Sequence, residues 1–219
     1  MLRFATMQVL SVNVGVPAPL SASGTRQVLS AIVKTPVSGP VRVGRLNLDG
    51  DKQADLRVHG GRDKAVYLYP SEHYEFWRRE LSETQLSWGM FGENLSTEGV
   101  LETTTCIGDR FRIGSALLEV RQPRMPCFKL ALRFGRRDMV KRFWTSGRSG
   151  IYFAVVEEGT VAAGDSIVPV SGLPNGITVD EILRLYRDPL PAHDRVEVAL
   201  ASPLAGSWKR ELRERLTVQ

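Results

Sequence analysis

The sequence predicts a mainly β protein with some helix, in which a barrel-like domain is followed by a small unit of three helices. Three observations lead to this fold class. Residues 1–170 contain many short apolar or alternating runs separated by glycine- and proline-rich turns, which is typical of a barrel or a sandwich. The composition then changes at residues 171–176 (SGLPNG). A helix-capping pattern and two further helical segments follow that change.

The strand candidates come from hydrophobic periodicity. Residues 9–14 (VLSVNV) alternate apolar and polar side chains, as a half-buried strand does. Residues 65–69 (AVYLY) form a continuous apolar run, which indicates a fully buried strand. Residues 103–113 and 116–120 predict a hairpin or meander with turns at residues 108–109 and 114–115. The remaining candidates are residues 31–34, 41–43, 46–48, 151–156 and 166–170.

Two helices are expected to interrupt these strands. Ser71 is a candidate N-cap for a helix that runs to about Leu81 and carries Tyr74 and Trp77 on one face. A second helix is expected at residues 129–143, and Gly135 is a candidate break in it.

The C-terminal unit is expected to be a separate small subdomain. We place residues 1–173 in the barrel-like domain and residues 174–219 in the helical one. Thr178 and Glu181 form a capping-box pattern, which predicts a helix through Leu185 that Pro189 and Pro191 end. Further helices are expected near residues 194–201 and 204–216.

Burial of the tail bears on the oligomeric state. Three short helices make a poor core alone, so their apolar side chains need to pack on the barrel or on a second subunit. These side chains are Leu185, Trp208, Leu212 and Leu216. A homodimer is therefore expected.

Composition places the chain among ordinary soluble proteins, with 42% hydrophobic and 24% charged residues. No apolar run approaches the roughly 20 residues of a membrane-spanning helix. Polar residues also interrupt the N-terminus, where a signal peptide needs an apolar core. We therefore expect a cytoplasmic protein with no membrane partner. Its two cysteines, Cys106 and Cys127, are then free thiols, too few for a disulfide scaffold.

Cys127 is the leading candidate for a reactive group. It lies in residues 122–129 (QPRMPCFK), where prolines disfavour a helix and Arg124 and Lys129 favour the thiolate. A thiolate attacks electrophiles or binds a soft metal. The alternative is a buried cysteine that acts as a small apolar filler.

Positive charge is concentrated around this cysteine. Nine basic residues and one acidic residue in residues 121–148 give this segment a charge of +8, against +5 for the whole chain. The excess suggests an anionic ligand, although some of these side chains could form a solvated helix face. The tail holds seven basic and seven acidic residues, and no basic-aromatic pattern of an RNA reader is present, so no nucleic-acid partner is expected.

Three further motifs carry polar chemistry. Gly60 and Gly61 in residues 59–64 (HGGRDK) would let backbone N–H groups approach an anion, with Lys64 supplying charge, or they form a simple tight turn. Residues 91–95 (FGENL) place a carboxylate beside an amide, or form a turn. Residues 146–150 (SGRSG) form a loop that carries Arg148, which binds an anion or merely connects two elements.

Seven segments in a fixed order carry a family resemblance. They are residues 50–55 (GDKQAD), 59–65 (HGGRDKA), 69–70 (YP), 91–95 (FGENL), 107–109 (IGD), 122–129 (QPRMPCFK) and 146–150 (SGRSG). In this order they resemble the MOSC family, the domain shared with molybdenum-cofactor sulfurases, and within it the bacterial YiiM-type members. The tail looks like the three-helix appendage of that subgroup.

The resemblance implies a MOSC β-barrel-like fold that carries the molybdenum cofactor (molybdopterin), with Cys127 binding molybdenum through sulfur. It implies an oxidoreductase that reduces N-hydroxylated purines or related N-hydroxy compounds in detoxification. Glu93 and His59 are the other catalytic candidates, because cleavage of an N–O bond needs protons. The cofactor-binding candidates are Gly60, Gly61, Lys64, Asn94, Arg124, Lys129 and Arg148.

Two other functions remain open. Cys127 could hold a persulfide in a sulfur carrier, or the chain could be a module that binds molybdenum or pyridoxal phosphate. Pyridoxal phosphate would need a Schiff-base lysine, either Lys64 or Lys129, and is the less expected cofactor. Since the sequence has no G-x-G-x-x-G fingerprint, an external electron-donor reductase is the expected partner of the oxidoreductase.

Overall fold

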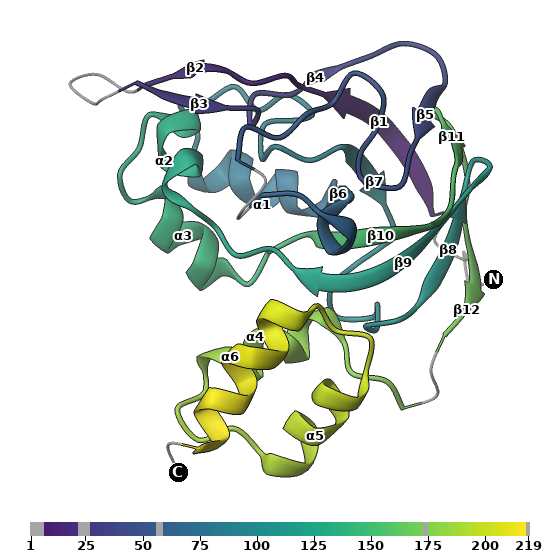
Figure 1. Cartoon of the computed structure of the whole chain (residues 1–219). Coiled ribbons are helices and arrows are strands. Elements are labelled where there is room, and N and C mark those ends of the chain that lie inside the picture. Colours follow the sequence, from purple (N-terminus) through teal and green to yellow (C-terminus); the bar gives the residue numbers. More distant parts are fainter. Residues whose placement is uncertain (1–6, 22–26, 56–58, 173–174, 218–219) are drawn as a thin grey trace, which may run out of the picture.

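The computed structural model describes residues 7–21, 27–55, 59–172 and 175–217 (Figure 1). Its strands are β1 (Gln8–Val14), β2 (Ala18–Leu20), β3 (Val28–Ser30), β4 (Thr35–Pro36), β5 (Val41–Val43), β6 (Val66–Pro70), β7 (Leu95–Glu98), β8 (Arg110–Ile113), β9 (Ala116–Pro123), β10 (Ile151–Glu157), β11 (Gly159–Val161) and β12 (Ile167–Ser171). Its helices are the short 3-10 helix η1 (Arg62–Lys64) and the α-helices α1 (Glu72–Glu80), α2 (Phe128–Phe134), α3 (Met139–Ser146), α4 (Val179–Arg187), α5 (His193–Ala201) and α6 (Gly206–Thr217).

One large sheet curves into the barrel that the sequence predicts. Its strands follow the order β12-β8-β9-β10-β6-β7-β1-β4. Neighbours are antiparallel except β6 and β7, which are parallel and joined through α1. The two sides of the sheet meet where Gln8 of β1 bridges to Ser166 and the Val9 N–H donates to the Asp165 carbonyl at 2.9 Å. The mainly β fold class with a barrel-like body is therefore confirmed.

Several strand predictions are confirmed and others are wrong. Strands β1, β5, β6, β9, β10 and β12 occur close to their predicted positions, and β8 occupies the end of its predicted run. Residues 31–34, 46–48 and 103–107 are not strands. In the last of these, the N–H groups of Thr104 and Thr105 bond the Leu101 carbonyl in a turn instead of a neighbouring strand. Strands β2, β3, β4, β7 and β11 were not predicted.

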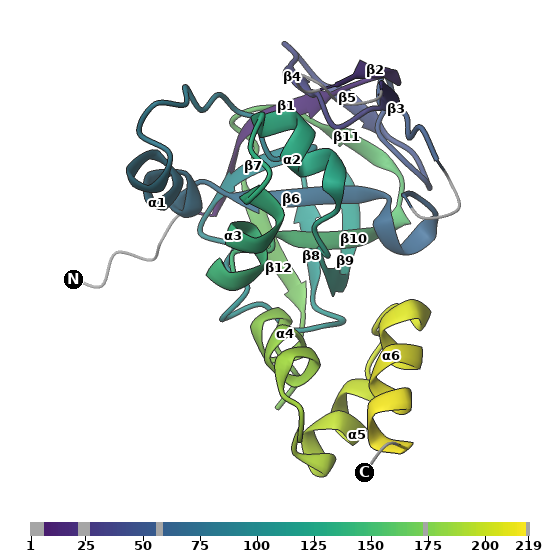
Figure 2. The same ribbon diagram turned by 90° about the vertical axis from the view of Figure 1, so that its left-hand side faces the viewer.

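Helices α1, α2 and α3 cover one side of the barrel, with α2 and α3 in front of β6 and β10 in Figure 2. The predicted helix at residues 129–143 is two helices, because Gly135 ends α2 in the left-handed region at φ 63°. Ser71 precedes α1 as predicted, but its side chain makes no capping hydrogen bond. A second, mainly aromatic core lies under these helices and includes Tyr69, Trp77 and Phe143.

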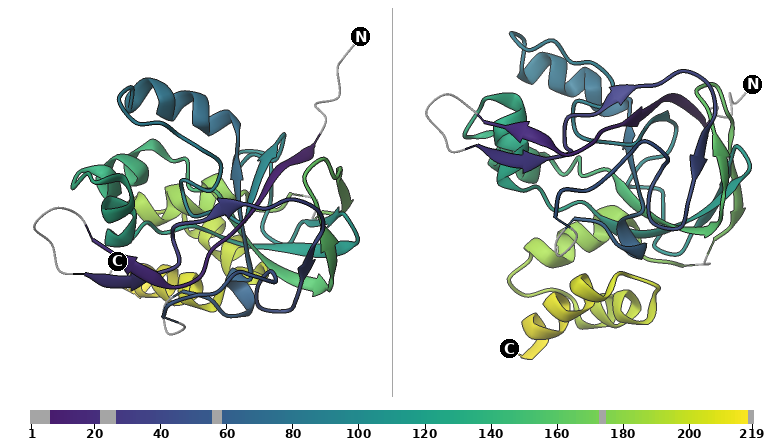
Figure 3. Two further views of the ribbon diagram at one scale, coloured as in Figure 1. Left: turned by 90° about the horizontal axis from the view of Figure 1, so that it is seen from above. Right: turned by 45° about the horizontal axis from the view of Figure 1, so that its top comes forward.

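The tail forms three helices that lie beneath the barrel (Figures 1 and 3). The capping box is confirmed, since Thr178 Oγ1 accepts the Glu181 N–H at 3.1 Å and the Thr178 N–H donates to the Glu181 carboxylate at 3.0 Å. Backbone bonds attach α4 to the barrel, among them Val179 N–H to the Thr105 carbonyl at 3.0 Å.

The tail shares its hydrophobic core with the barrel. Leu185, Trp208 and Leu212 are buried in the same cluster as the barrel residues. The predicted boundary at residues 173 and 174, and the side chain of Leu216, lie outside the described residues. None of the helices in the described ranges has the length and apolar character that a membrane crossing would require.

Candidate functional site

Two adjoining pockets meet at Cys127. A narrow pocket of about 80 Å³ lies in the barrel, and a wider one of about 540 Å³ opens between the barrel and the C-terminal helices. The residues that line both are His59, Lys64, Arg124, Cys127 and Tyr152. Four of these five were predicted site residues, so the structure brings together positions that are far apart in the sequence.

Cys127 has the local structure that the prolines predict. Its backbone is extended, with φ −126° and ψ 169°, and α2 begins at the next residue. The Leu130 N–H donates to the Cys127 carbonyl at 2.9 Å, which fixes the chain at the start of the helix. The side chain is half-buried and lines both pockets, unlike an apolar filler sealed in a core.

His59 lies against this sulfur, with Nε2 3.5 Å from Cys127 Sγ. Burial, followed by the charges of Lys129 and Lys64, lowers the pKa of His59 to about 4. The ring is therefore neutral near pH 7. Its Nδ1 atom is buried and has no hydrogen-bond partner among the described residues. A thiolate can only accept, so with Nε2 donating to sulfur the Nδ1 lone pair would be available to a ligand.

The cations of the site have different environments. Arg124 is 6% exposed, donates to the Phe91 carbonyl, and lies 4.7 Å from the centre of the Tyr67 ring. Burial opposes its charge, yet Tyr67 and other neighbours raise the pKa of Arg124 above its ordinary value. Lys64 is the last residue of η1, and burial lowers its pKa. Lys129, on α2, lines the narrow pocket.

The remaining charge of residues 121–148 is partly a solvated surface, as the alternative interpretation held. Arg136 and Arg142 both pair with Asp138 on the surface, and Arg142 also pairs with Glu80. Only part of the +8 charge therefore faces the pockets.

The narrow pocket contains a buried ion pair that the sequence analysis does not predict. Lys34 and Asp51 are 8% and 3% exposed and form a close salt bridge. Burial lowers the pKa of Lys34, and Asp51 opposes this shift. Asp51 also accepts the Gly15 N–H at 2.8 Å. The one lysine that ends the apolar run at residues 31–34 was the available signal, but that run was interpreted as a strand.

Asn94 lines the narrow pocket, but its amide is occupied by the protein. Its Oδ1 accepts the Tyr67 N–H at 3.0 Å and its Nδ2 donates to Asp51 at 2.9 Å. Asn94 therefore positions Asp51 and β6 rather than presenting a free edge to a ligand.

Three predicted site residues do not line either pocket. Glu93 is fully buried, where it accepts from the Tyr74 hydroxyl, from two backbone N–H groups at 2.8 and 3.1 Å, and from the Ser96 hydroxyl at 2.8 Å. Burial raises the pKa of Glu93. Arg148 lies 3.7 Å from the Phe76 ring centre and donates to the Ser146 carbonyl at 3.0 Å. Gly61 precedes η1 at φ 83°, next to the pocket residue Gly60.

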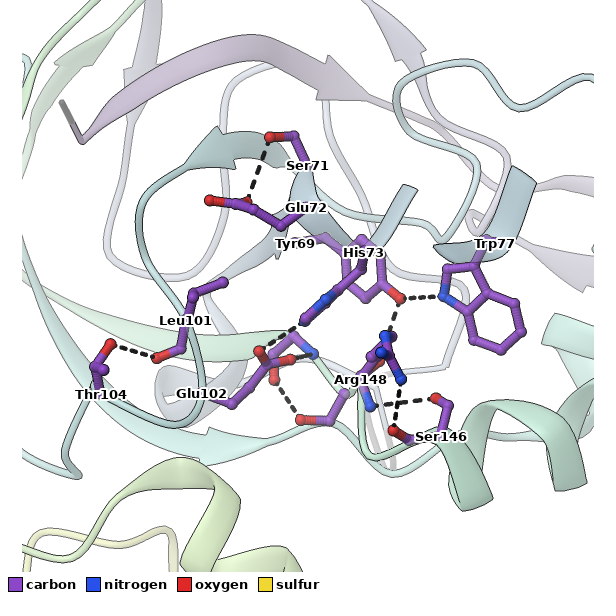
Figure 4. A network of polar contacts seen from close by, with 12 residues as sticks. Tyr69, Ser71, Glu72, His73, Trp77, Leu101, Glu102, Thr104, Ser146 and Arg148 are labelled. Atoms are coloured by element: carbon purple, nitrogen blue, oxygen red, sulfur yellow. Dashed lines mark hydrogen bonds and ion pairs between the residues drawn. The ribbon is translucent and has the colours of Figure 1, made fainter. Parts of the chain in front are cut away.

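Figure 4 shows the network that surrounds Arg148. Glu102 is its centre, with the His73 ring 2.7 Å from its carboxylate and the Gly150 N–H donating to it at 2.6 Å. The Tyr69 hydroxyl donates to the Arg148 carbonyl at 3.2 Å. This network holds the loop at residues 146–150. Arg148 lies on this loop and is not among the residues that line either pocket.

Comparison with known proteins agrees with this architecture. The MOSC domain matches residues 55–168. The chain belongs to the MOSC family. YflK of Bacillus subtilis is 42% identical over 216 residues, which cover 96% of this chain and 97% of that protein. The crystal structure of YiiM from Geobacillus stearothermophilus aligns with a TM-score of 0.79 at 34% identity, covering 96% of this chain and 99% of the other. The protein is thus a YiiM-type MOSC protein.

A third relative, from Gibberella moniliformis, bears the name "Reductase". It is 40% identical over 144 residues, which cover 64% of this chain but only 26% of that protein.

MOSC domains are associated with the molybdenum cofactor, and the residues of this site fit such a group. The described residues contain no group of three or more His, Cys, Asp or Glu side chains that could hold a metal ion. One thiolate therefore needs further ligands, which a pterin dithiolene provides. If the group is bound here, Lys64, Arg124 and Lys129 would supply positive charge for its phosphate, and the unpartnered His59 Nδ1 would offer an acceptor.

Proposed function

We propose that this protein is a molybdenum-cofactor-dependent oxidoreductase that reduces N-hydroxylated purines or related N-hydroxy compounds, with Cys127 as the protein ligand to molybdenum. The observation that carries the proposal is the half-buried sulfur of Cys127 at the junction of a cationic pocket and a wide open one. The MOSC family and the fungal relative named a reductase support it.

The two pockets suggest separate binding sites for the cofactor and the substrate. The narrow pocket, with Lys34, Asp51 and Lys129, suits an anionic or strongly polar part of the cofactor. The wide pocket has a volume in the range of about 300–1,000 Å³ that is typical of ligand sites. A substrate in the wide pocket would reach Cys127 and His59 at its inner end.

The reaction is a two-electron reduction, in which an N–OH group, two electrons and two protons become an N–H group and water. The bound cofactor would supply the two electrons beside Cys127. His59 is neutral near pH 7, so it serves as a hydrogen-bonding group for sulfur and ligand rather than as a charged acid. Lys64 lines both pockets with a lowered pKa, which makes it a better proton donor than an exposed lysine.

Two partners belong to this proposal. An external reductase is expected to supply electrons, since the chain lacks a dinucleotide-binding fingerprint. A homodimer stays a prediction, although the shared core shows that the tail packs on the barrel of its own chain.

The test compares wild type with Cys127→Ala and with Cys106→Ala, produced in a host that synthesises the cofactor. Cys106 is the matched control, because it is also half-buried but lines neither pocket. Molybdenum and pterin per chain are measured first. Conversion of 6-N-hydroxylaminopurine to adenine is then followed with reduced methyl viologen as electron donor. We expect near-stoichiometric cofactor and activity in wild type and Cys106→Ala, and neither in Cys127→Ala.

Other results would contradict the proposal. Full molybdenum content and activity in Cys127→Ala would remove the ligand role. Wild type without molybdenum, but with a persulfide on Cys127 by intact mass, would indicate a sulfur carrier instead. A borohydride-stable adduct on Lys64 or Lys129 would indicate pyridoxal phosphate.

A further inference from the structure

The wide pocket contains a buried acceptor that no other part of the described protein uses. Gln122 is 2% exposed, and its Oε1 atom has no hydrogen-bond partner among the described residues. Its side chain lines the wide pocket but not the narrow one. A buried carboxamide oxygen without a partner costs free energy, so such atoms are rare unless a water or a ligand bonds them.

The strand explains why this side chain faces the pocket. Gln122 lies opposite Tyr152 in the antiparallel pair of β9 and β10, so both side chains project to the same face. Arg124 follows two residues later, and all three line the wide pocket. The orientation of Gln122 is therefore set by the ladder rather than by a flexible loop.

Part of the wall of the wide pocket is aromatic. Tyr186 of α4 and Trp208 of α6 lie edge to face, with ring centres 5.2 Å apart, and both line the pocket. Phe128 lies at the rim and is 56% exposed. Aromatic walls around a directional acceptor suit a flat ring that carries an N–H group.

A bulge in β9 attaches the aromatic wall to the barrel. Tyr152 and Phe153 pair with Gln122 and Val120, so Arg121 is an extra residue in β9. Its carbonyl accepts the Ala205 N–H at 3.1 Å, immediately before α6. The irregularity therefore places α6, and Trp208 with it, beside Gln122.

We propose that the wide pocket is a recognition site for a planar nitrogen heterocycle, in which Gln122 Oε1 accepts an N–H of the ring system and Trp208 and Tyr186 form its wall. The heterocycle is either the substrate purine, in which case the inference rests on the proposed function, or the pterin of the cofactor. The C-terminal helices then contribute directly to ligand selection.

The test measures binding of adenine and of caffeine by isothermal titration calorimetry to purified full-length protein. Caffeine is a purine without any N–H group, so it probes the aromatic wall alone. The variants are Gln122→Met, which keeps the length of the side chain, and Gln85→Leu, an exposed control that lines neither pocket. Molybdenum and pterin content are measured on the same samples.

For a substrate site, we expect Gln122→Met to weaken adenine binding about tenfold, the usual effect of one lost hydrogen bond. Caffeine binding and cofactor content should then match wild type. Loss of pterin from Gln122→Met alone would assign the acceptor to the pterin. Unchanged adenine affinity together with unchanged pterin content would overturn the inference. A second variant, Trp208→Phe, should weaken the binding of both adenine and caffeine. Affinities for both ligands that match wild type would remove the helices from the site.

These outcomes separate the inference from the proposed function. Wild type that lacks molybdenum and reductase activity, but binds adenine through Gln122, would refute the reductase and leave the recognition site standing. If wild type is an active reductase and Gln122→Met matches it in every measurement, the recognition site is refuted and the reductase stands.

Discussion

Glu93 and Asn94 are adjacent in the sequence but belong to different environments. Asn94 reaches Asp51 in the narrow pocket, whereas Glu93 points into the core and accepts four hydrogen bonds there. The carboxylate thus organises residues 89–96, and the structure favours this role over the predicted proton transfer.

The residue-scale prediction concerns Glu93→Gln. A carboxylate accepts from all four donors, but the glutamine NH₂ would face donors instead of acceptors. We expect the free energy of unfolding to fall by about 2–4 kcal/mol, measured by urea titration. Glu75→Gln, on the exposed side of α1, should stay within about 0.5 kcal/mol of wild type. An unchanged urea midpoint combined with lost reductase activity would instead restore the catalytic assignment.

At the scale of the element, the break between α2 and α3 shapes the side of the barrel that carries Cys127. The Gly135 N–H bonds the carbonyls of Ala131 and Leu132, which closes α2 in the left-handed conformation. The chain can then turn so that Phe134 of α2 and Phe143 of α3 both enter the aromatic core. A single helix through residues 129–143 could not place both in that way.

The element-scale prediction is that Gly135→Ala destabilises the protein by about 1–2 kcal/mol, because a left-handed backbone disfavours a side chain. Nothing lies within 4 Å of the added Cβ, so the loss would come from the backbone conformation alone. The control is Gly206→Ala at the start of α6, where the nearest atom is the end of a flexible arginine at 3.9 Å. That change should be neutral or slightly stabilising in the same urea titration. Equal losses in both variants would show that the conformation at Gly135 is not the cause.

At the scale of the whole molecule, the barrel and the C-terminal helices depend on each other. Ile177 and Leu212 are fully buried in the cluster that also contains the barrel residues Val120 and Phe153. Since three short helices cannot build a stable core alone, this shared cluster supports both parts. The wide pocket lies between them, so its shape depends on their docking.

The corresponding prediction is that Leu212→Ala lowers the free energy of unfolding by about 2–5 kcal/mol, as expected for a large cavity in a core. Backbone circular dichroism and tryptophan fluorescence should report one coincident transition, because the two parts unfold together. Leu190→Ala, at a side chain that is 73% exposed, should change little. An early separate transition of the tail would contradict the shared core.

Much of the fold was predictable because its signals are local. The alternation in β1, the apolar run of β6 and the capping box of α4 each involve only a few consecutive residues. β7 was missed because its sequence, LSTE, looks polar, and its burial comes from lying between β6 and β1. A short peptide cannot reveal the neighbours that will cover it.

The sequence by itself determined the extended backbone at Cys127, its basic neighbours and the helix break at Gly135, since proline, charge and glycine act over short distances. Only the tertiary structure decided which polar residues face the ligand. It joined Lys34 to Asp51, turned Glu93 into the core, left Gln122 without a partner and brought Trp208 beside it. The physical reason is that a pocket is made by contacts between distant segments, and whether a polar group is satisfied depends on all of them at once.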